Sequence, residues 1–209
     1  MGFQGRRDAP QAEAEGAGGN RLAPTVIAIV PVGGVPAGIL HALAPAIEAR
    51  FPGRAARIAA RGLPAPDDAY EAARRQYRSD PIVDQLQSVA GGAERVLGVT
   101  DVDLFTPGLN FVFGQARPGG PALMSLARLR PEFWGEAPDA GRLVERAIKE
   151  AVHELGHTYG LGHCRDAQCV MWFSNTLAET DRKSDCFCRT HEAQLRRALG
   201  RAGAGETEP

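Results

Sequence analysis

The sequence has no run that approaches the roughly 20 consecutive apolar residues a membrane span needs, so we expect no membrane segment. It also lacks an excess of either charge, because 24 basic and 25 acidic residues leave a formal net charge of −1. That balance argues against nucleic acid or an anionic membrane surface as a partner. Met1 to Leu22 lack the apolar segment of a secretory signal, which favours a cytoplasmic location.

The length of 209 residues suits one compact domain with short tails. Residues 1–22 are polar and rich in glycine and are expected to be disordered, as is a polar tail at 201–209. We expect a single domain over residues 23–200, with an N-terminal part at 23–163 and a C-terminal part at 164–200. We expect a monomer, although no feature of the sequence sets the oligomeric state.

Apolar runs predict an ordered series of strands and helices. Most strands precede a long helix near residue 150, which indicates an α/β (α+β) domain with a mixed, twisted β-sheet. After residue 163 the chain becomes irregular. Ala122 to Leu129 could be the edge strand along which an extended peptide pairs. Predicted strands cover 25–30, 54–60, 95–104, 111–116 and 122–129, and predicted helices cover 37–50, a charged stretch at 70–90 interrupted by Pro81, 141–159 and 191–199.

The most informative segment carries three histidines within eleven residues. His153 and His157 are four apart on the long helix, so they lie on one face with Cβ atoms ~5–6 Å apart. Their ring nitrogens can therefore bind one ion at Zn–N distances of ~2.0–2.1 Å. Glu154 is close enough to contact a water on that ion without binding the ion itself. This arrangement suits a general base.

His163 needs a break in the helix before it can reach the same ion. Gly160 can supply that break, because glycine readily takes the left-handed conformation that ends a helix. Three histidine ligands leave the fourth position open, as in catalytic rather than structural zinc sites. An amphipathic helix with solvated histidines is the alternative, but five fixed positions match by chance in only about one in 10⁴–10⁵ such chains.

These residues resemble the metzincin pattern His-Glu-x-x-His-x-x-Gly-x-x-His, which has a methionine turn downstream. Cys164, directly after the third histidine, and the run from Cys169 to Met171 make the chain similar to the archaemetzincin family, as does the segment 108–114. The resemblance implies a metzincin-like fold with an active-site helix and an irregular zinc-binding C-terminal subdomain. It also implies a zinc metallopeptidase with aminopeptidase-like activity on short peptides. Met171 would then be the methionine of the turn beneath the zinc.

The resemblance further implies a second, structural zinc, since the family holds one on four cysteines. Cys164 and Cys169 match the first pair, but His191 stands where the last cysteine of the second pair belongs. One possible ligand set is therefore Cys164, Cys169, Cys188 and His191. The other uses Cys186 as the fourth ligand in place of His191. We favour His191, because two residues separate it from Cys188, a spacing typical of zinc chelation. Two zinc ions per chain are expected.

Some interpretations stay open at this stage. Trp172, Phe173 and Asn175 follow the methionine turn and either shape a pocket for the residue after the cleaved bond or belong to the core. A non-catalytic, zinc-stabilised interaction domain is the rival function. Glu154 favours the enzyme, because no structural need places a glutamate beside His153. The sequence does not fix the physiological substrate, or the choice between internal and N-terminal cleavage.

Overall fold

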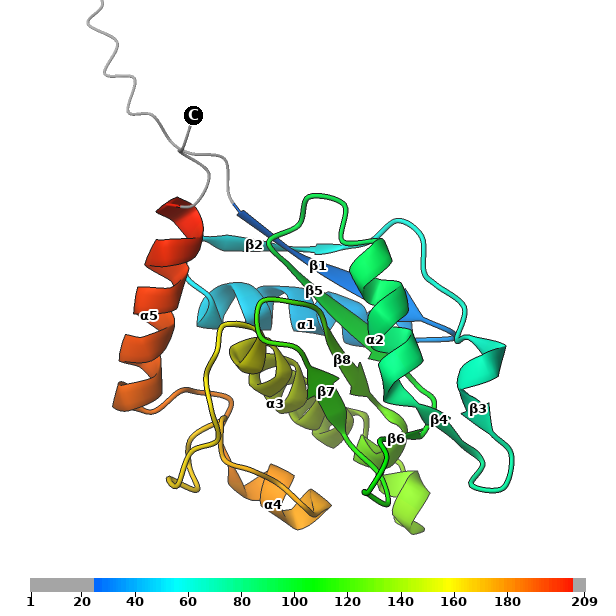
Figure 1. Ribbon diagram of the computed structural model, residues 1–209. Coiled ribbons are helices and arrows are strands. Elements are labelled where there is room, and N and C mark those ends of the chain that lie inside the picture. Colours follow the sequence, from blue (N-terminus) through cyan, green and yellow to red (C-terminus); the bar gives the residue numbers. More distant parts are fainter. Residues whose placement is uncertain (1–24, 205–209) are drawn as a thin grey trace, which may run out of the picture.

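The structure, a computed structural model, describes residues 25–204, so the expected tail at 1–22 and residues 205–209 lie outside it. A five-stranded sheet in the order β2-β1-β5-β8-β7 forms its centre (Figure 1). Strands β2, β1, β5 and β8 are parallel, and β7 pairs antiparallel with β8 at one edge. The expected mixed α/β class is confirmed. The strands are β1 (Thr25–Val32), β2 (Arg54–Ile58), β5 (Arg95–Thr100), β7 (Gly114–Ala116) and β8 (Ala122–Ser125).

Helices cover both faces of this sheet. Along β1 the side chains alternate: Ile27 and Ile29 pack with helices α1 and α3, whereas Val30 packs with α2 on the other face. Each of these fully buried aliphatic side chains stabilises the fold by ~1.5–3 kcal/mol. The helices are α1 (Ala37–Arg50), α2 (Ser79–Ser88), α3 (Ala140–Thr158), α4 (Leu177–Arg182) and α5 (Arg189–Ala204), with short 3-10 helices at Asp67–Ala69, Ala127–Leu129 and Pro131–Trp134.

The edge strand of the sheet differs from the prediction. Strand β8 pairs with β5 on one side and β7 on the other, so Ala122 to Leu129 does not form the edge. The strand ends at Ser125, whose hydroxyl donates to the Val102 carbonyl at 2.6 Å, and a 3-10 helix follows. The edge strand on this side of the sheet is β7, which keeps only the last three residues of the predicted strand 111–116, and β2 forms the opposite edge.

The expected helix over residues 70–90 is wrong in its first half. Strands β3 (Tyr70–Glu71), β4 (Gln76–Arg78) and β6 (Leu104–Phe105) form a second, small sheet there. The hairpin turns through Arg75, which has a φ of 55°. Helix α2 starts only at Ser79, and Pro81 lies in its first turn, where a missing N–H leaves no hydrogen bond unmade.

The long helix α3 matches the prediction within one residue at each end. Asp139 caps its start by accepting a hydrogen bond from the Arg142 backbone N–H at 2.9 Å, which stabilises the helix by ~1 kcal/mol. The helix ends at Thr158, and Gly160 follows with a φ of 80°. The final helix α5 is longer than expected and continues to Ala204. Among residues 25–204, no helix combines the length and apolar character that crossing a membrane requires.

Candidate functional site

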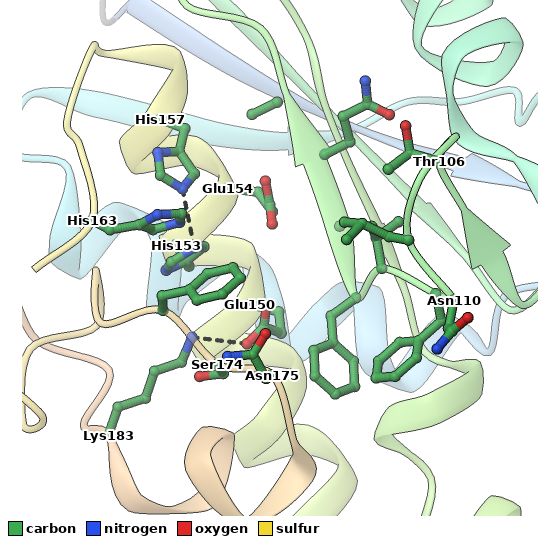
Figure 2. Close-up of a pocket in the computed structure, with 18 residues that line it drawn as sticks. Thr106, Asn110, Glu150, His153, Glu154, His157, His163, Ser174, Asn175 and Lys183 are labelled. Atoms are coloured by element: carbon green, nitrogen blue, oxygen red, sulfur yellow. Dashed lines mark hydrogen bonds and ion pairs between the residues drawn. The ribbon is translucent and has the colours of Figure 1, made fainter.

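Three histidines meet beside the β7 edge of the sheet. His153 and His157 project from α3, and His163 returns to them from the following loop (Figure 2). Their ring centroids lie 4.6 to 5.5 Å apart, and the nitrogens that face one another lie within 4.8 Å. The Nε2 atoms of His153 and His157 are 3.0 Å apart. The fold therefore brings together the three histidines singled out from the sequence.

Backbone carbonyls orient two of the rings. His153 Nδ1 lies 2.8 Å from the Val170 carbonyl, and His157 Nδ1 lies 2.7 Å from the Leu161 carbonyl. Nδ1–H donation to these carbonyls leaves each Nε2 lone pair directed at the shared space, as in metal-binding histidines. Burial lowers the pKa of both rings, well below the ordinary value for His153. Neutral imidazole is the form that binds a metal, so this donor set fits zinc.

The turn after α3 brings His163 back to the helix. Gly160 takes the left-handed conformation, and the Leu161 N–H donates to the Gly156 carbonyl at 3.1 Å. The ring of His163 is exposed on one side and lies 4.7 Å from the ring of Phe173. All three histidines line one pocket, so the space between their rings adjoins it.

Glu154 points from α3 into the same pocket, towards strand β7. Burial is the main reason that its pKa lies well above the ordinary value; the charge of Glu150 raises it further, and that of Lys183 lowers it. Gly114 of β7 faces the carboxylate closely: a β-carbon there would lie 2.6 Å from the Glu154 side chain. A glycine at this position therefore makes room for the carboxylate.

The pocket itself has a volume of about 520 Å³. Helix α3 and strand β7 form two of its sides, and the segment from Thr106 to Phe113 and the residues after Met171 contribute others (Figure 2). Phe173 and Asn175 line the pocket, whereas the alternative interpretation placed them in the core. Trp172 does not line the pocket. Its backbone forms an isolated β-bridge with Cys164, and the Arg182 guanidinium carbon lies 5.7 Å from the centroid of the Trp172 ring.

Met171 packs against α3 at Gly156, the residue before His157. Its side chain is fully buried, and a β-carbon at Gly156 would lie only 2.5 Å from its sulfur. The Cys164 N–H donates to the Met171 carbonyl at 2.8 Å, which ties the loop after His163 to this turn. The role of Met171 as the methionine of a turn beneath a zinc stays a prediction.

A second group of metal-binding side chains begins with Cys164, the residue directly after His163. It contains Cys164, Cys169, Cys188 and His191, whose ligand atoms all lie within 4.8 Å of one another. Cys186 is outside it: its thiol is exposed and lies 3.4 Å from the Asp185 carboxylate. None of the four cysteines forms a disulfide. The structure thus brings together the ligand set that contains His191.

The donors of this second cluster also fit zinc. His191 Nδ1 lies 3.3 Å from Cys188 Sγ and 3.8 Å from Cys169 Sγ. Burial opposes ionisation of Cys188, but hydrogen bonds with His191, Cys169 and Cys164 together outweigh it and lower the pKa of the Cys188 thiol to about 7. Burial raises the pKa of Cys169 to about 12. His191 Nε2 lies 3.1 Å from the Gly162 carbonyl, next to His163 in the chain.

Two charged residues at the pocket escaped the sequence interpretation. Lys183 Nζ lies 2.9 Å from Glu150 Oε1, and both side chains are almost completely buried. Glu150 precedes Glu154 by one helical turn on the same face of α3, so its helical position was a usable signal. Lys183 follows helix α4, and no local pattern indicated that it reaches the pocket.

Comparison with known proteins is consistent with this geometry. Residues 51–197 match the model of peptidase family M54. The chain is 44% identical over 182 residues to an archaemetzincin of Pyrococcus furiosus, covering 84% of this chain and 95% of that protein. It is 51% identical over 139 residues to an archaemetzincin of Methanopyrus kandleri, covering 66% of this chain and 76% of that protein.

A solved structure agrees at the level of the fold. The crystal structure of archaemetzincin from Methanopyrus kandleri matches with a TM-score of 0.75 and 41% identity, covering 84% of this chain and 96% of that one. Sequence identity, the fold and the set of metal-binding donors therefore all indicate the same family. The chain belongs to peptidase family M54, the family of the archaemetzincins, and is a zinc metallopeptidase.

Proposed function

We propose that the protein hydrolyses peptide bonds with Glu154 as the general base, beside a zinc ion held by His153, His157 and His163. Zinc bound to three imidazoles would act as a Lewis acid: it would polarise a carbonyl and lower the pKa of bound water to about 7. The single observation that carries the proposal is the position of Glu154, buried in the pocket next to the histidines with no hydrogen bond or ion pair to any described residue.

The environment of Glu154 suits proton transfer in both directions. Burial raises the pKa of its carboxyl, which makes the carboxylate a stronger base towards the attacking water; the proton that it takes then passes to the leaving amine. Gly114 and the body of α3 keep the carboxylate in one place. His153, His157 and Glu154 come from a single rigid helix, which holds base and metal ligands in a fixed relation.

We propose short peptides as substrates, cleaved in an aminopeptidase-like manner. A cavity of about 520 Å³ is large enough for a few residues rather than for a long chain. Strand β7 lines this cavity and has a free edge, so an extended peptide can pair with it through main-chain hydrogen bonds.

A second zinc is proposed at Cys164, Cys169, Cys188 and His191, so that each chain holds two ions. All four donor atoms face one point, and reduced cysteines of this kind are typical of the cytoplasm. We therefore propose a cytoplasmic protein. We also propose a single domain and a monomer, because one chain supplies all the donors of both clusters and neither site needs a second copy to complete it.

The test of the general base is Glu154→Gln. We expect zinc content to stay at the wild-type level while hydrolysis of a mixed peptide substrate falls by ~10²–10⁴-fold. Glu145→Gln is the matched control, because Glu145 is exposed on the same helix and its replacement leaves the pocket unchanged. A Glu154→Gln enzyme with full activity would refute the role given to this carboxylate.

A further inference from the structure

The buried pair of Glu150 and Lys183 lies beside the groups that carry the proposed chemistry, yet takes no part in it. Lys183 is 2% exposed and Glu150 is 3% exposed, and both line the pocket that holds Glu154 (Figure 2). Charged side chains are buried at such depth only when they are paired or have a ligand to bind. The pair therefore needs an explanation in terms of what enters the pocket.

The ion pair leaves most of its hydrogen-bonding capacity unused. Neither Lys183 Nζ nor Glu150 Oε1 makes an aligned hydrogen bond with any described residue, although they are 2.9 Å apart. An ammonium group has three N–H donors, so at least two remain free after its contact with Glu150. Ser174 Oγ, on the same pocket lining, is also buried without a described partner. The wall of the pocket therefore holds buried donors whose hydrogen-bonding capacity is unmet among the described residues.

The direction of strand β7 decides which end of a peptide reaches Lys183. Gly114 lies against Glu154, whereas the Gly119 N–H donates to the Thr158 carbonyl at 2.8 Å, so β7 and α3 run the same way. A peptide that pairs antiparallel with β7 runs the opposite way. Its residues after the scissile bond therefore lie towards Glu150 and Lys183.

The spacing along α3 sets how far beyond the scissile bond this contact falls. Glu150 precedes Glu154 by four residues, a rise of about 6 Å along the helix. That length corresponds to one to two extended residues. The group that meets Lys183 is therefore the side chain of the first residue after the bond, or a chain terminus one or two residues after it.

We propose that Lys183 binds a carboxylate of the substrate on the leaving-group side of the scissile bond, which rests on the peptidase function proposed above. Glu150 holds the Lys183 side chain in place while the pocket is empty. The carboxylate is either an aspartate or glutamate side chain directly after the bond, or the free C-terminus of a short peptide. In both cases Lys183 Nζ donates hydrogen bonds that a neutral amide cannot match.

Two matched peptide pairs separate these sources. The first pair has Asp or Asn directly after the scissile bond and an amidated C-terminus. The second pair has a neutral residue there and a free or an amidated C-terminus. We expect kcat/KM for the acid to exceed that for its neutral match by about tenfold to a hundredfold in one pair. The pair that responds identifies the source, and equal values in both pairs would overturn the proposal.

A binding measurement keeps the inference separate from the hydrolytic function. The same peptides are titrated calorimetrically into the zinc-loaded Glu154→Gln protein. If the wild type cleaves neutral peptides but neither assay distinguishes acid from amide, the subsite is wrong and the peptidase function stands. If nothing is cleaved but the acid binds more tightly, the subsite stands and the hydrolytic mechanism falls.

Replacement of Lys183 assigns the preference to this side chain. Lys183→Met alone strands a buried Glu150 charge and threatens folding, so Glu150→Gln/Lys183→Met is the second variant. We expect the acid-to-amide ratio to fall to about 1 in the double variant. Lys149→Met is the matched control, because Lys149 Nζ donates to the Thr180 and Asp181 carbonyls outside the pocket. The acid-to-amide ratio of this control should equal that of the wild type. A double variant that keeps the wild-type ratio would overturn the proposal.

Discussion

At the scale of single residues, Gly114 sets the position of the Glu154 carboxylate. A β-carbon at Gly114 would lie 2.6 Å from Glu154 Cγ and Oε1, closer than real contacts allow. Gly114→Ala should therefore push the carboxylate away from the space between the histidines. Since a displacement of about 1 Å can cost ~10²-fold in rate, we expect a loss of that order in kcat, with zinc content unchanged.

The control for this substitution is Gly38→Ala in the first turn of α1. Nothing lies within 4 Å of a β-carbon there, so activity should be that of the wild type. Zinc content, measured by metal analysis of both proteins, separates displacement of Glu154 from loss of the metal. A Gly114→Ala enzyme with wild-type kcat would show that the carboxylate tolerates the shift.

His191 offers a second prediction at this scale, because it contacts both the cysteine cluster and the loop before His163. In His191→Cys the second cluster keeps four ligands, but the contact to the Gly162 carbonyl is lost. We expect both proposed zinc ions to remain, and a chelator to remove the one proposed at the three histidines several-fold faster, as for other losses of a supporting hydrogen bond.

Cys186→Ser is the comparison for His191→Cys. Its thiol lies outside the cluster, against Asp185, so metal content and release rate should both stay at wild-type values. Loss of one zinc in Cys186→Ser, with both retained in His191→Ala, would instead favour the ligand set that contains Cys186.

How far the sequence could predict single residues depends on whether their chemistry is local. His153 and His157 are four residues apart on α3, so their spacing alone predicted a shared face, and Glu154 is the next residue round the helix from His153. Lys183 reaches the pocket from a segment 33 residues after Glu150 and carries no pattern of its own. Gly114 likewise shows its importance only once β7 is placed against α3.

At the scale of elements, an ion pair joins α3 to α4. The Arg146 guanidinium contacts both carboxylate oxygens of Asp181 at 2.6 and 2.7 Å, and a third N–H donates to the Leu129 carbonyl. Arg146 is 2% exposed, so its charge depends on these partners. The pair holds α4, and with it the segment that leads to Lys183, against α3.

Acid should weaken this junction. The hydrogen bond from Arg146 is the main cause that lowers the pKa of Asp181. A carboxylate with a lowered folded-state pKa contributes stability that is complete above its unfolded pKa of about 3.9 and is lost as the pH falls through the folded value. We expect Asp181→Asn to lower the free energy of unfolding by about 1–3 kcal/mol at pH 7, and by much less near pH 3.

Urea unfolding of both proteins at the two pH values measures this difference. Asp84→Asn is the comparison, because the Asp84–Arg117 pair is largely exposed and should contribute little at either pH. An effect of Asp181→Asn that is equally large at pH 3 would mean that the asparagine disrupts packing rather than the charge pair.

The elements themselves were predictable where their ends carry local signals. Asp139 and Gly160 mark the two ends of α3, and its bounds were predicted within one residue. The position of β8 inside the sheet was not predictable, because strand order depends on partners far away in the sequence. The apolar run Ala122–Ser125 indicated a strand, but not which strands would lie beside it.

At the scale of the whole molecule, the sheet domain and the segment after α3 are stabilised differently. Residues 159–188 contain only the short helix α4 as regular structure, whereas the sheet has a continuous apolar core. This segment is anchored by the two donor clusters, by Arg146–Asp181 and by an Arg50–Asp185 contact at 2.7 Å. Metal binding is therefore expected to stabilise residues 159–188 far more than the sheet.

Removal of the metals tests this division. A ligand that binds only the folded state stabilises it by about 4 kcal/mol at a thousandfold excess over its Kd, so chelation under reducing conditions should lower the unfolding temperature markedly. Hydrogen exchange should rise first in residues 161–188, while β1 and β5 stay protected as the centre of the core. Added zinc should reverse both changes. If exchange rose equally in β1 and in residues 161–188, the metals would be holding the whole fold together rather than its C-terminal part, and the local role assigned to the two clusters would be wrong.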